Sequence, residues 1–248
     1  MISKLANLVG YGLIRTGASL PARIHSLDEE ARLIRLLEQQ RIDCVLDVGA
    51  HHGWFGHKLR RAGYIGDIIS FEPVPANAAQ IEAKAAADPG WSVQRCALGE
   101  VAETKIFNVL STSQGGTTMS SFLEPKIGFA RREAVEVEVR RLEDVLDAVL
   151  PADSNPRLFL KVDTQGFDIP VFRGAGRWLD RVFAMQSEIS VIPIYEGMTR
   201  YTDSLTVYQD MGFALIDLLV VNRTPDGRVL EFDCRMARPP VGQAGAKA

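Results

Sequence analysis

The sequence predicts a doubly wound α/β fold, with a mostly parallel sheet that ends in an antiparallel β-hairpin. The first observation is the stretch 44–56, which combines a short apolar run, a turn with two glycines and the start of a helix. Such a strand–turn–helix unit opens a doubly wound sheet. The second observation is a pair of strand-like stretches, 213–221 and 228–236, joined by residues 224–227. A connection this short cannot make a parallel crossover, so these two strands must pair antiparallel.

The composition indicates one large soluble domain. The chain has 248 residues, of which 46% are hydrophobic and 24% charged, as in ordinary globular proteins. The net charge is −3 and the basic residues are scattered, so we expect no nucleic-acid partner. Cys44, Cys96 and Cys234 are isolated from one another. We therefore expect small core residues in a reducing compartment, a cytoplasmic protein and no zinc site.

Three parts are expected along the chain. Residues 1–41 form an N-terminal helical extension that packs on the domain, residues 42–238 the main domain, and residues 239–248 a disordered Gly/Ala-rich tail. Within the extension, residues 27–40 have the spacing of an amphipathic helix. The apolar run 5–14 is too short to span a bilayer, so any membrane contact there would be peripheral. The sequence leaves the oligomeric state open.

Between the first motif and the hairpin, strands and helices alternate. Helices are expected at 76–87, 142–150, 169–178 and 205–211, and strands at 67–73, 91–97, 105–110, 134–140, 157–163 and 182–192. The stretch 98–141 interrupts this alternation, because a loop of small residues at 111–121 separates two strands without a helix. Loops of this length are usually functional or disordered. We keep both interpretations for it, a lid over a substrate and a surface loop.

The turn after the first strand has the pattern D-x-G-x-x-x-G, from Asp47 through Gly49 to Gly53. A dinucleotide fingerprint needs G-x-G-x-x-G, and its second glycine position is occupied here by His51. The histidine side chain would fill the space that a pyrophosphate needs. The turn therefore favours a ligand such as S-adenosylmethionine over NAD. We expect Asp47, Gly49, His51 and Gly53 to bind it, with Asp47 near its cationic groups.

A second acidic residue ends the next strand. Glu72 follows Asp47 by 25 residues, close to the spacing of roughly 20 between such a turn and a ribose-binding acid. A carboxylate at this position can accept hydrogen bonds from both ribose hydroxyls. Pro73 stops the strand there, since it cannot donate to a ladder. The end of the third strand, Cys96 and Ala97, is expected beside the adenine.

Several motifs together resemble the FkbM family of S-adenosylmethionine-dependent methyltransferases, from about residue 42 to 238. Five parallel strands followed by a hairpin is the layout of the class I methyltransferase (Rossmann-like) sheet and not of the dinucleotide fold. The segments similar to the family's motifs are 47–50 with Gly53, 71–73, 160–168, 174–175, 188–190, 193–197 and 212–213 with Asp217. One departure is His51, where the family usually has Asn, and we expect weaker or pH-sensitive cofactor binding from it.

The resemblance implies an O-methyltransferase, since the family mostly methylates hydroxyl groups, often on sugars of glycolipids, polysaccharides or natural products. Asp163 and Glu188 end neighbouring strands on the ligand side of the sheet. One of them could act as a general base, or both could share a divalent ion. We favour the version without metal, because no third ligand with clear spacing is present. Gln165, Tyr195 and Glu196 are expected to line the acceptor pocket.

Two other functions stay open from the sequence. The first is an NAD-dependent α/β enzyme, which His51 and the terminal hairpin disfavour. The second is a cofactor-binding scaffold or partner subunit without activity. The cofactor that raises the melting temperature would separate a methyltransferase from an NAD-dependent enzyme. A scaffold would bind the cofactor but form no product on any acceptor.

Overall fold

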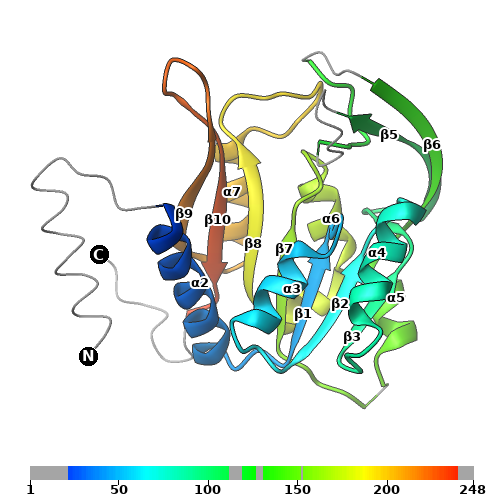
Figure 1. Ribbon diagram of the computed structural model, residues 1–248, viewed down its shortest axis with the longest axis vertical. Helices are drawn as coiled ribbons and strands as arrows, with labels where there is room; N and C mark the ends of the chain where they lie inside the picture. The colour runs from blue at the N-terminus through cyan, green and yellow to red at the C-terminus, as the bar shows by residue number, and fades with distance from the viewer. Residues whose placement is uncertain (1–21, 112–118, 127–130, 152, 240–248) are drawn as a thin grey trace, which may run out of the picture.

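The computed structural model describes residues 22–111, 119–126, 131–151 and 153–239 (Figure 1). Within these residues the larger sheet has seven strands, in the order β3 (Trp91–Gln94), β2 (Asp67–Phe71), β1 (Cys44–Val48), β7 (Leu158–Val162), β8 (Val182–Ser190), β10 (Val229–Ala237) and β9 (Ala214–Arg223). The first five strands are parallel, and β10 is antiparallel to both of its neighbours. The predicted fold class is therefore confirmed.

Helices cover both faces of this sheet. On the near side in Figure 1 lie α2 (Ala22–Gln39), α3 (Trp54–Arg61) and α4 (Pro75–Ala85), and on the far side α5 (Leu142–Val149), α6 (Asp168–Gly174) and α7 (Tyr201–Asp210). Each face has its own apolar core. The two cores meet at β1, whose five residues are all buried, with Val45 in the near core and Leu46 in the far one. A strand covered on both faces reads as a continuous apolar run, which explains the sequence signal there.

Helix α2 packs into the near core through Leu33, Leu36 and Leu37, which cluster with Val45 and Ala184 of the central strands. It begins at Ala22, before the expected position. Among the described residues, none of the helices combines the length and apolarity that crossing a membrane requires.

A second, three-stranded sheet lies beyond the carboxyl ends of β1 and β2, at the upper right of Figure 1. It consists of β4 (Ala97–Leu98), β6 (Arg131–Arg140) and β5 (Glu103–Ser111). The expectation of one strand over 91–97 was wrong, because pairing in the large sheet ends at Gln94, opposite Phe71. Its neighbour β2 ends there too, so the chain leaves that sheet and Ala97 pairs with β6. Most of the loop 111–121 lies outside the described residues, so its role as a lid stays a prediction.

Two helix boundaries also differ from expectation. The helix expected at 169–178 is split: α6 ends at Gly174, and the 3-10 helix η1 (Gly176–Arg181) follows. Gly176 has a φ of 50°, which interrupts the right-handed helix. Helix α7 begins at Tyr201, four residues before the expected start.

Gly174, the last residue of α6, packs closely against the chain that follows β4. We therefore expect Gly174→Ala to destabilise the fold. An added Cβ would lie 2.0 Å from the carbonyl oxygen of Gly99, which is backbone and cannot turn aside. The free energy of unfolding should fall by about 3 kcal/mol, the upper end of the usual cost of overpacking. Ile65→Ala is the control, since Ile65 is 95% exposed and its loss should change stability by less than about 0.5 kcal/mol. Equal urea midpoints for the two variants would contradict the argument.

Candidate functional site

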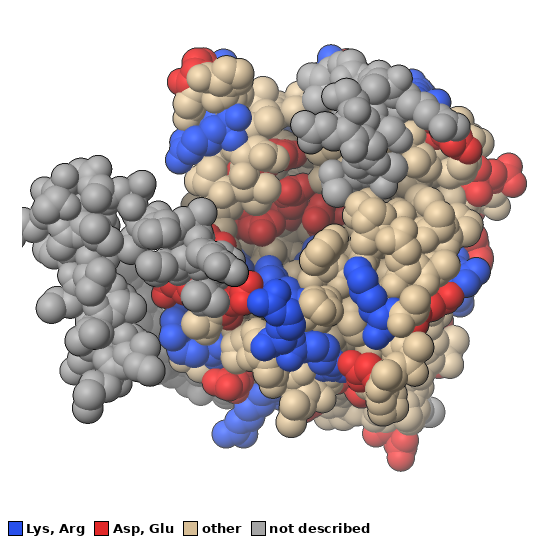
Figure 2. Space-filling view, viewed as in Figure 1, with Lys and Arg blue, Asp and Glu red and all other residues tan. Residues whose placement is uncertain are grey.

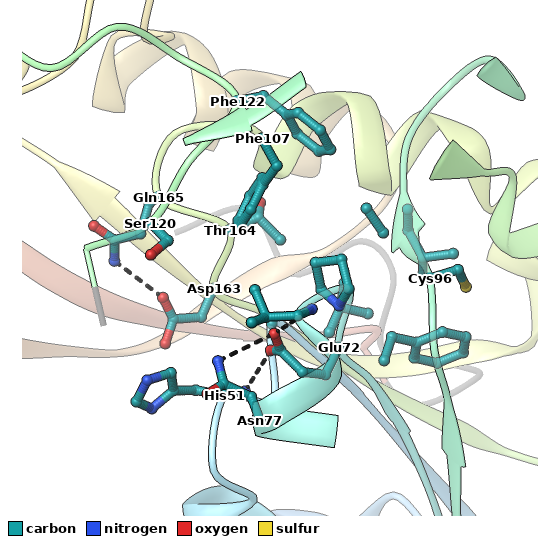
Figure 3. A pocket seen from close by; sticks show the side chains of 17 residues that line it. His51, Glu72, Asn77, Cys96, Phe107, Ser120, Phe122, Asp163, Thr164 and Gln165 are labelled. Carbon is teal, nitrogen blue, oxygen red and sulfur yellow. Dashed lines mark hydrogen bonds between the residues drawn. The ribbon is translucent and has the colours of Figure 1, made fainter. Parts of the chain in front are cut away.

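A pocket lies where the two sheets meet, at the carboxyl ends of β1 and β2 (Figure 3). It contains about 570 Å³ of empty space, part of which is open to solvent. One wall is polar and comes from the turn after β1 and the end of β2. The opposite wall is apolar and comes largely from the small sheet and the chain before it, with Cys96, Ala97, Leu98, Phe107 and Phe122.

The turn after β1 requires left-handed backbone at three positions. Gly49, His51 and Gly53 have φ values of 75°, 50° and 72°. At Gly49 an added Cβ would lie 2.0 Å from the carbonyl oxygen of Asp163, so only glycine fits there. Gly49 and His51 line the pocket, as expected for cofactor-binding residues. Gly53 instead faces Ile81 and the Trp91 ring, where it starts α3.

Asp47 does not line the pocket, in contrast to its expected place near the ligand's cationic groups. Its side chain is fully buried, and its carboxylate lies 3.1 Å from the Lys161 Nζ. The two residues are register partners across β1 and β7, which accounts for the pairing. Burial alone would lower the pKa of Lys161, but Asp47 and Asp163 raise it above its usual value. The Lys161 Nζ also donates to the carbonyl oxygen of Gly49, so this ion pair supports the turn from below.

Glu72 points into the polar wall of the pocket. Its carboxylate accepts hydrogen bonds from the backbone N–H of His51 at 2.9 Å, from that of Val74 at 2.9 Å and from the Asn77 amide at 3.3 Å (Figure 3). Burial raises the pKa of Glu72 to about 7, although these three donors oppose the shift. A carboxylate offers about four acceptor positions, so capacity for a ligand hydroxyl remains.

An open cleft adjoins the pocket on the other side of the turn. Figure 2 shows it as a hollow with acidic side chains inside and basic side chains along its lower edge. Asp163, Glu188 and Asp233 supply carboxylates to this cleft, and Lys58 and Lys161 supply ammonium groups. Asp163 and His51 line both the pocket and the cleft. These two residues therefore stand at the junction between the cavities.

Gln165 joins the two carboxylates that the sequence singled out. Its Nε2 donates to Asp163 Oδ1 at 3.2 Å and to Glu188 Oε2 at 2.5 Å. Gln165 has a φ of 52°, an uncommon conformation that often marks functional sites. Burial, and then the charges of Asp163 and Glu231, raise the pKa of Glu188 well above its usual value. Glu188 therefore tends to keep its proton.

Tyr195 and Glu196, the two residues after β8 that were expected to line the acceptor pocket, lie outside both cavities. Tyr195 is fully buried, and its hydroxyl lies 2.5 Å from the Met119 carbonyl oxygen and 3.2 Å from Gln165 Oε1. It sits behind Gln165 and lines neither cavity. Glu196 also lines neither, since its side chain is 69% exposed and lies near Lys126.

Sequence reasoning missed several residues of the two cavities. Lys161 carried a usable signal, because a lysine inside an otherwise apolar strand is rarely buried without a partner. Asn77 and the aromatic pair Phe107 and Phe122 had no local signal, because they reach the pocket through the turn of α4 and the small sheet. The described residues contain no group of three or more His, Cys, Asp or Glu that could hold a metal ion.

The sheet order, with an acidic residue at the end of β2 facing a pocket at the carboxyl edge, defines a class I methyltransferase. Residues 47–215 match the family model for the Methyltransferase FkbM domain, and the chain belongs to this family. S-adenosylmethionine is therefore its cofactor. Comparison with curated protein sequences gives no match.

Solved structures with a similar arrangement are remote in sequence. Magnesium protoporphyrin IX methyltransferase from Synechocystis PCC 6803, with bound cofactor, is 8% identical over 88% of this chain and 82% of that chain, with a TM-score of 0.47. Aeropyrum pernix fibrillarin, also with the cofactor bound, is 13% identical over 79% and 66%, with a TM-score of 0.44. The chain of WbdD is 16% identical over 88% and 40%, with a TM-score of 0.47.

The pocket residues fit this cofactor. Glu72 is buried, held by three donors and able to accept a ribose hydroxyl. Cys96 and Ala97 lie in the apolar wall, where a purine ring would be desolvated. His51 holds Glu72 through its backbone N–H, so the replacement of Asn by His at this position leaves that contact in place.

The raised pKa of Glu72 predicts that cofactor binding depends on pH. An ionised carboxylate accepts hydrogen bonds from the ribose more strongly than a protonated one. With a pKa of about 7, Glu72 changes from mostly protonated at pH 6 to mostly ionised at pH 8. The affinity for S-adenosylhomocysteine should therefore rise with pH over this interval, by up to about tenfold. Calorimetry at pH 6, 7 and 8 measures it.

Glu72→Gln is the matched variant for this prediction. It should weaken binding by roughly 1.5–3 kcal/mol at pH 8 and remove the pH dependence that Glu72 causes. His51 does not titrate in this interval, because burial and the neighbouring His52 lower its pKa to about 4. The same pH profile in both proteins would refute the role of Glu72.

Proposed function

We propose that the protein transfers a methyl group from S-adenosylmethionine to a hydroxyl group of a sugar, a glycolipid or another natural product. The observation that carries the proposal is the position of Asp163 and His51 at the junction of the pocket and the cleft. A cofactor in the pocket supplies an electrophilic methyl group. An acceptor in the cleft then meets the cofactor at this junction, which favours an in-line transfer by alignment.

Asp163 is the general base in this proposal. As the acceptor oxygen gains the methyl group, its proton passes to the Asp163 carboxylate. Gln165 fixes Oδ1 of that carboxylate, and Lys161 lies 3.5 Å from Oδ2. Both contacts hold the side chain in one orientation, which general-base catalysis requires. Glu188 and Tyr195 are positioning residues: Glu188 accepts from the same Gln165 Nε2 that donates to Asp163, and the Tyr195 hydroxyl contacts Gln165 Oε1.

The other two candidates for the base fit less well. Glu188 tends to keep its proton, because burial and the charge of Asp163 raise its pKa. His51 is neutral at pH 7, but its pKa of about 4 makes it a weak base. It also lacks the negative charge that would stabilise the positive charge developing on the acceptor oxygen.

A hydroxyl-bearing acceptor suits the polar groups of the cleft. Asp163, Glu188 and Asp233 offer carboxyl oxygens, and hydroxyl groups are donors that such oxygens bind. The position between Asp163 and Glu188, where a shared divalent ion would lie, is taken by the Gln165 amide. This contact supports the version of the mechanism without metal.

Asp163→Asn tests the base directly. Turnover should fall by roughly 10²-fold or more, while the affinity for S-adenosylhomocysteine stays nearly unchanged. The measurement is transfer of labelled methyl groups to a panel of glycosides, with calorimetry for the cofactor. Glu196→Gln is the control, since this exposed residue lines neither cavity and should leave both quantities unchanged.

Three outcomes would count against the proposal. Near-normal turnover in Asp163→Asn would remove this residue from the chemistry. Loss of activity in EDTA that Mg²⁺ restores would favour the shared metal ion. Cofactor binding without methyl transfer to any acceptor would favour a non-catalytic scaffold.

A further inference from the structure

One face of α3 forms a wall of the cleft and carries an unusual set of side chains. Trp54, Lys58 and Arg61 follow the spacing i, i+4, i+7, which places them on the same side of a helix. All three line the cleft, together with His57. Figure 2 shows basic side chains along the lower edge of the hollow, opposite the acidic ones within it. The cleft thus has an acidic wall near the reacting end and a basic wall along α3.

The two cations on α3 form no ion pair with a carboxylate in the part of the chain that the structure describes, although the charges of Asp233 and Glu30 act to raise the pKa of Lys58. Lys58 is half-buried, and its Nζ lies 5.1 Å from the centroid of the Phe55 ring. Neither Lys58 nor Arg61 forms an ion pair or a hydrogen bond with another described residue. Burial and the nearby charge of Arg235 lower the pKa of Lys58, so its surroundings disfavour the charge that it carries. A bound anion would lower the free-energy cost of keeping Lys58 charged in these surroundings.

The neighbouring cations are already engaged. Lys161 pairs with Asp47 and Asp163. Arg235 donates to the Gln186 side chain at 2.8 Å and to the carbonyl oxygen of Glu29 at 3.2 Å. Lys58 and Arg61 therefore remain for a ligand.

We propose that the acceptor is an anionic glycoside, whose carboxylate or phosphate group binds Lys58 and Arg61 while its reacting hydroxyl lies at Asp163. This inference rests on the proposed function and names its substrate class. From Trp54 to Arg61 the helix rises by roughly 10 Å, which is longer than one sugar ring. The exposed indole of Trp54 lies at the start of this face, where the body of a sugar can pack on it.

The test compares acceptors that share the sugar ring and differ at C6, which is neutral in one and carries an anion in the others. The probes are p-nitrophenyl glucoside, the matching glucuronide and the 6-phosphate of the glucoside, or the same set built on whichever sugar the panel identifies. The anionic members should have a kcat/KM at least tenfold above that of the neutral one. The comparison of the glucuronide with the 6-phosphate shows whether the site prefers a carboxylate or a phosphate group. Equal kcat/KM values across the set would overturn the inference and leave the proposed function standing.

Lys58→Gln and Lys58→Arg show whether Lys58 causes the preference for anionic acceptors. Lys58→Gln should raise KM for the anionic acceptor about tenfold or more with little change in kcat, and leave the neutral acceptor unaffected. Lys58→Arg should restore the low KM. Arg177→Gln is the control, since this exposed arginine on η1 pairs with Asp147 and does not line the cleft. An equal effect of Lys58→Gln on neutral and anionic acceptors would contradict an anion site.

A binding measurement separates this inference from the proposed function. Calorimetry follows the glucuronide and the glucoside binding to the protein saturated with S-adenosylhomocysteine. If no acceptor is methylated, the proposed function fails, but tighter binding of the glucuronide that is lost in Lys58→Gln still supports the anion site. Equal affinity for both sugars, or a glucuronide affinity that Lys58→Gln leaves unchanged, overturns it.

Discussion

The buried ion pair between Asp47 and Lys161 is the interaction on which the rest of the site depends. It joins β1 to β7 at the carboxyl end of the sheet, where both strands reach the ligand side. The same ammonium group contacts the carbonyl of Gly49 and lies near Asp163. One cation therefore fixes the cofactor turn and the proposed base relative to each other. Removing one partner of such a pair leaves a buried charge uncompensated, which costs about 3–5 kcal/mol.

The pocket depends equally on the place where β2 and β3 stop. The pairing of β2 with β3 ends at Phe71 and Gln94, and the chain after β3 continues into a second sheet that covers the opening. The pocket thereby lies between a polar edge and an apolar cover. Glu72 lies deep enough for its pKa to rise, yet three donors keep it able to ionise near neutral pH.

Most of the large sheet and the positions of Gly49, Glu72 and Asp163 could be predicted from the sequence, because each depends on local features. Short apolar runs, glycine turns and an acid at a strand end are visible within a few residues. The partner of Asp47 could not be predicted, since it is set by the register of β1 with β7, more than 100 residues apart in sequence. The same applies to Ala97, which leaves one sheet for another, and to Tyr195, which packs behind Gln165 and not in an acceptor pocket.

The contact between Glu72 and residue 51 has a consequence for how the family can change. The bond that holds Glu72 comes from the backbone of residue 51, while the residue itself lines both cavities. Any residue that tolerates a left-handed conformation can supply the same N–H. Natural variation at this position can therefore reshape both cavities while the bond to Glu72 is kept. At a single position of the chain, the backbone holds Glu72 and the side chain is free to change.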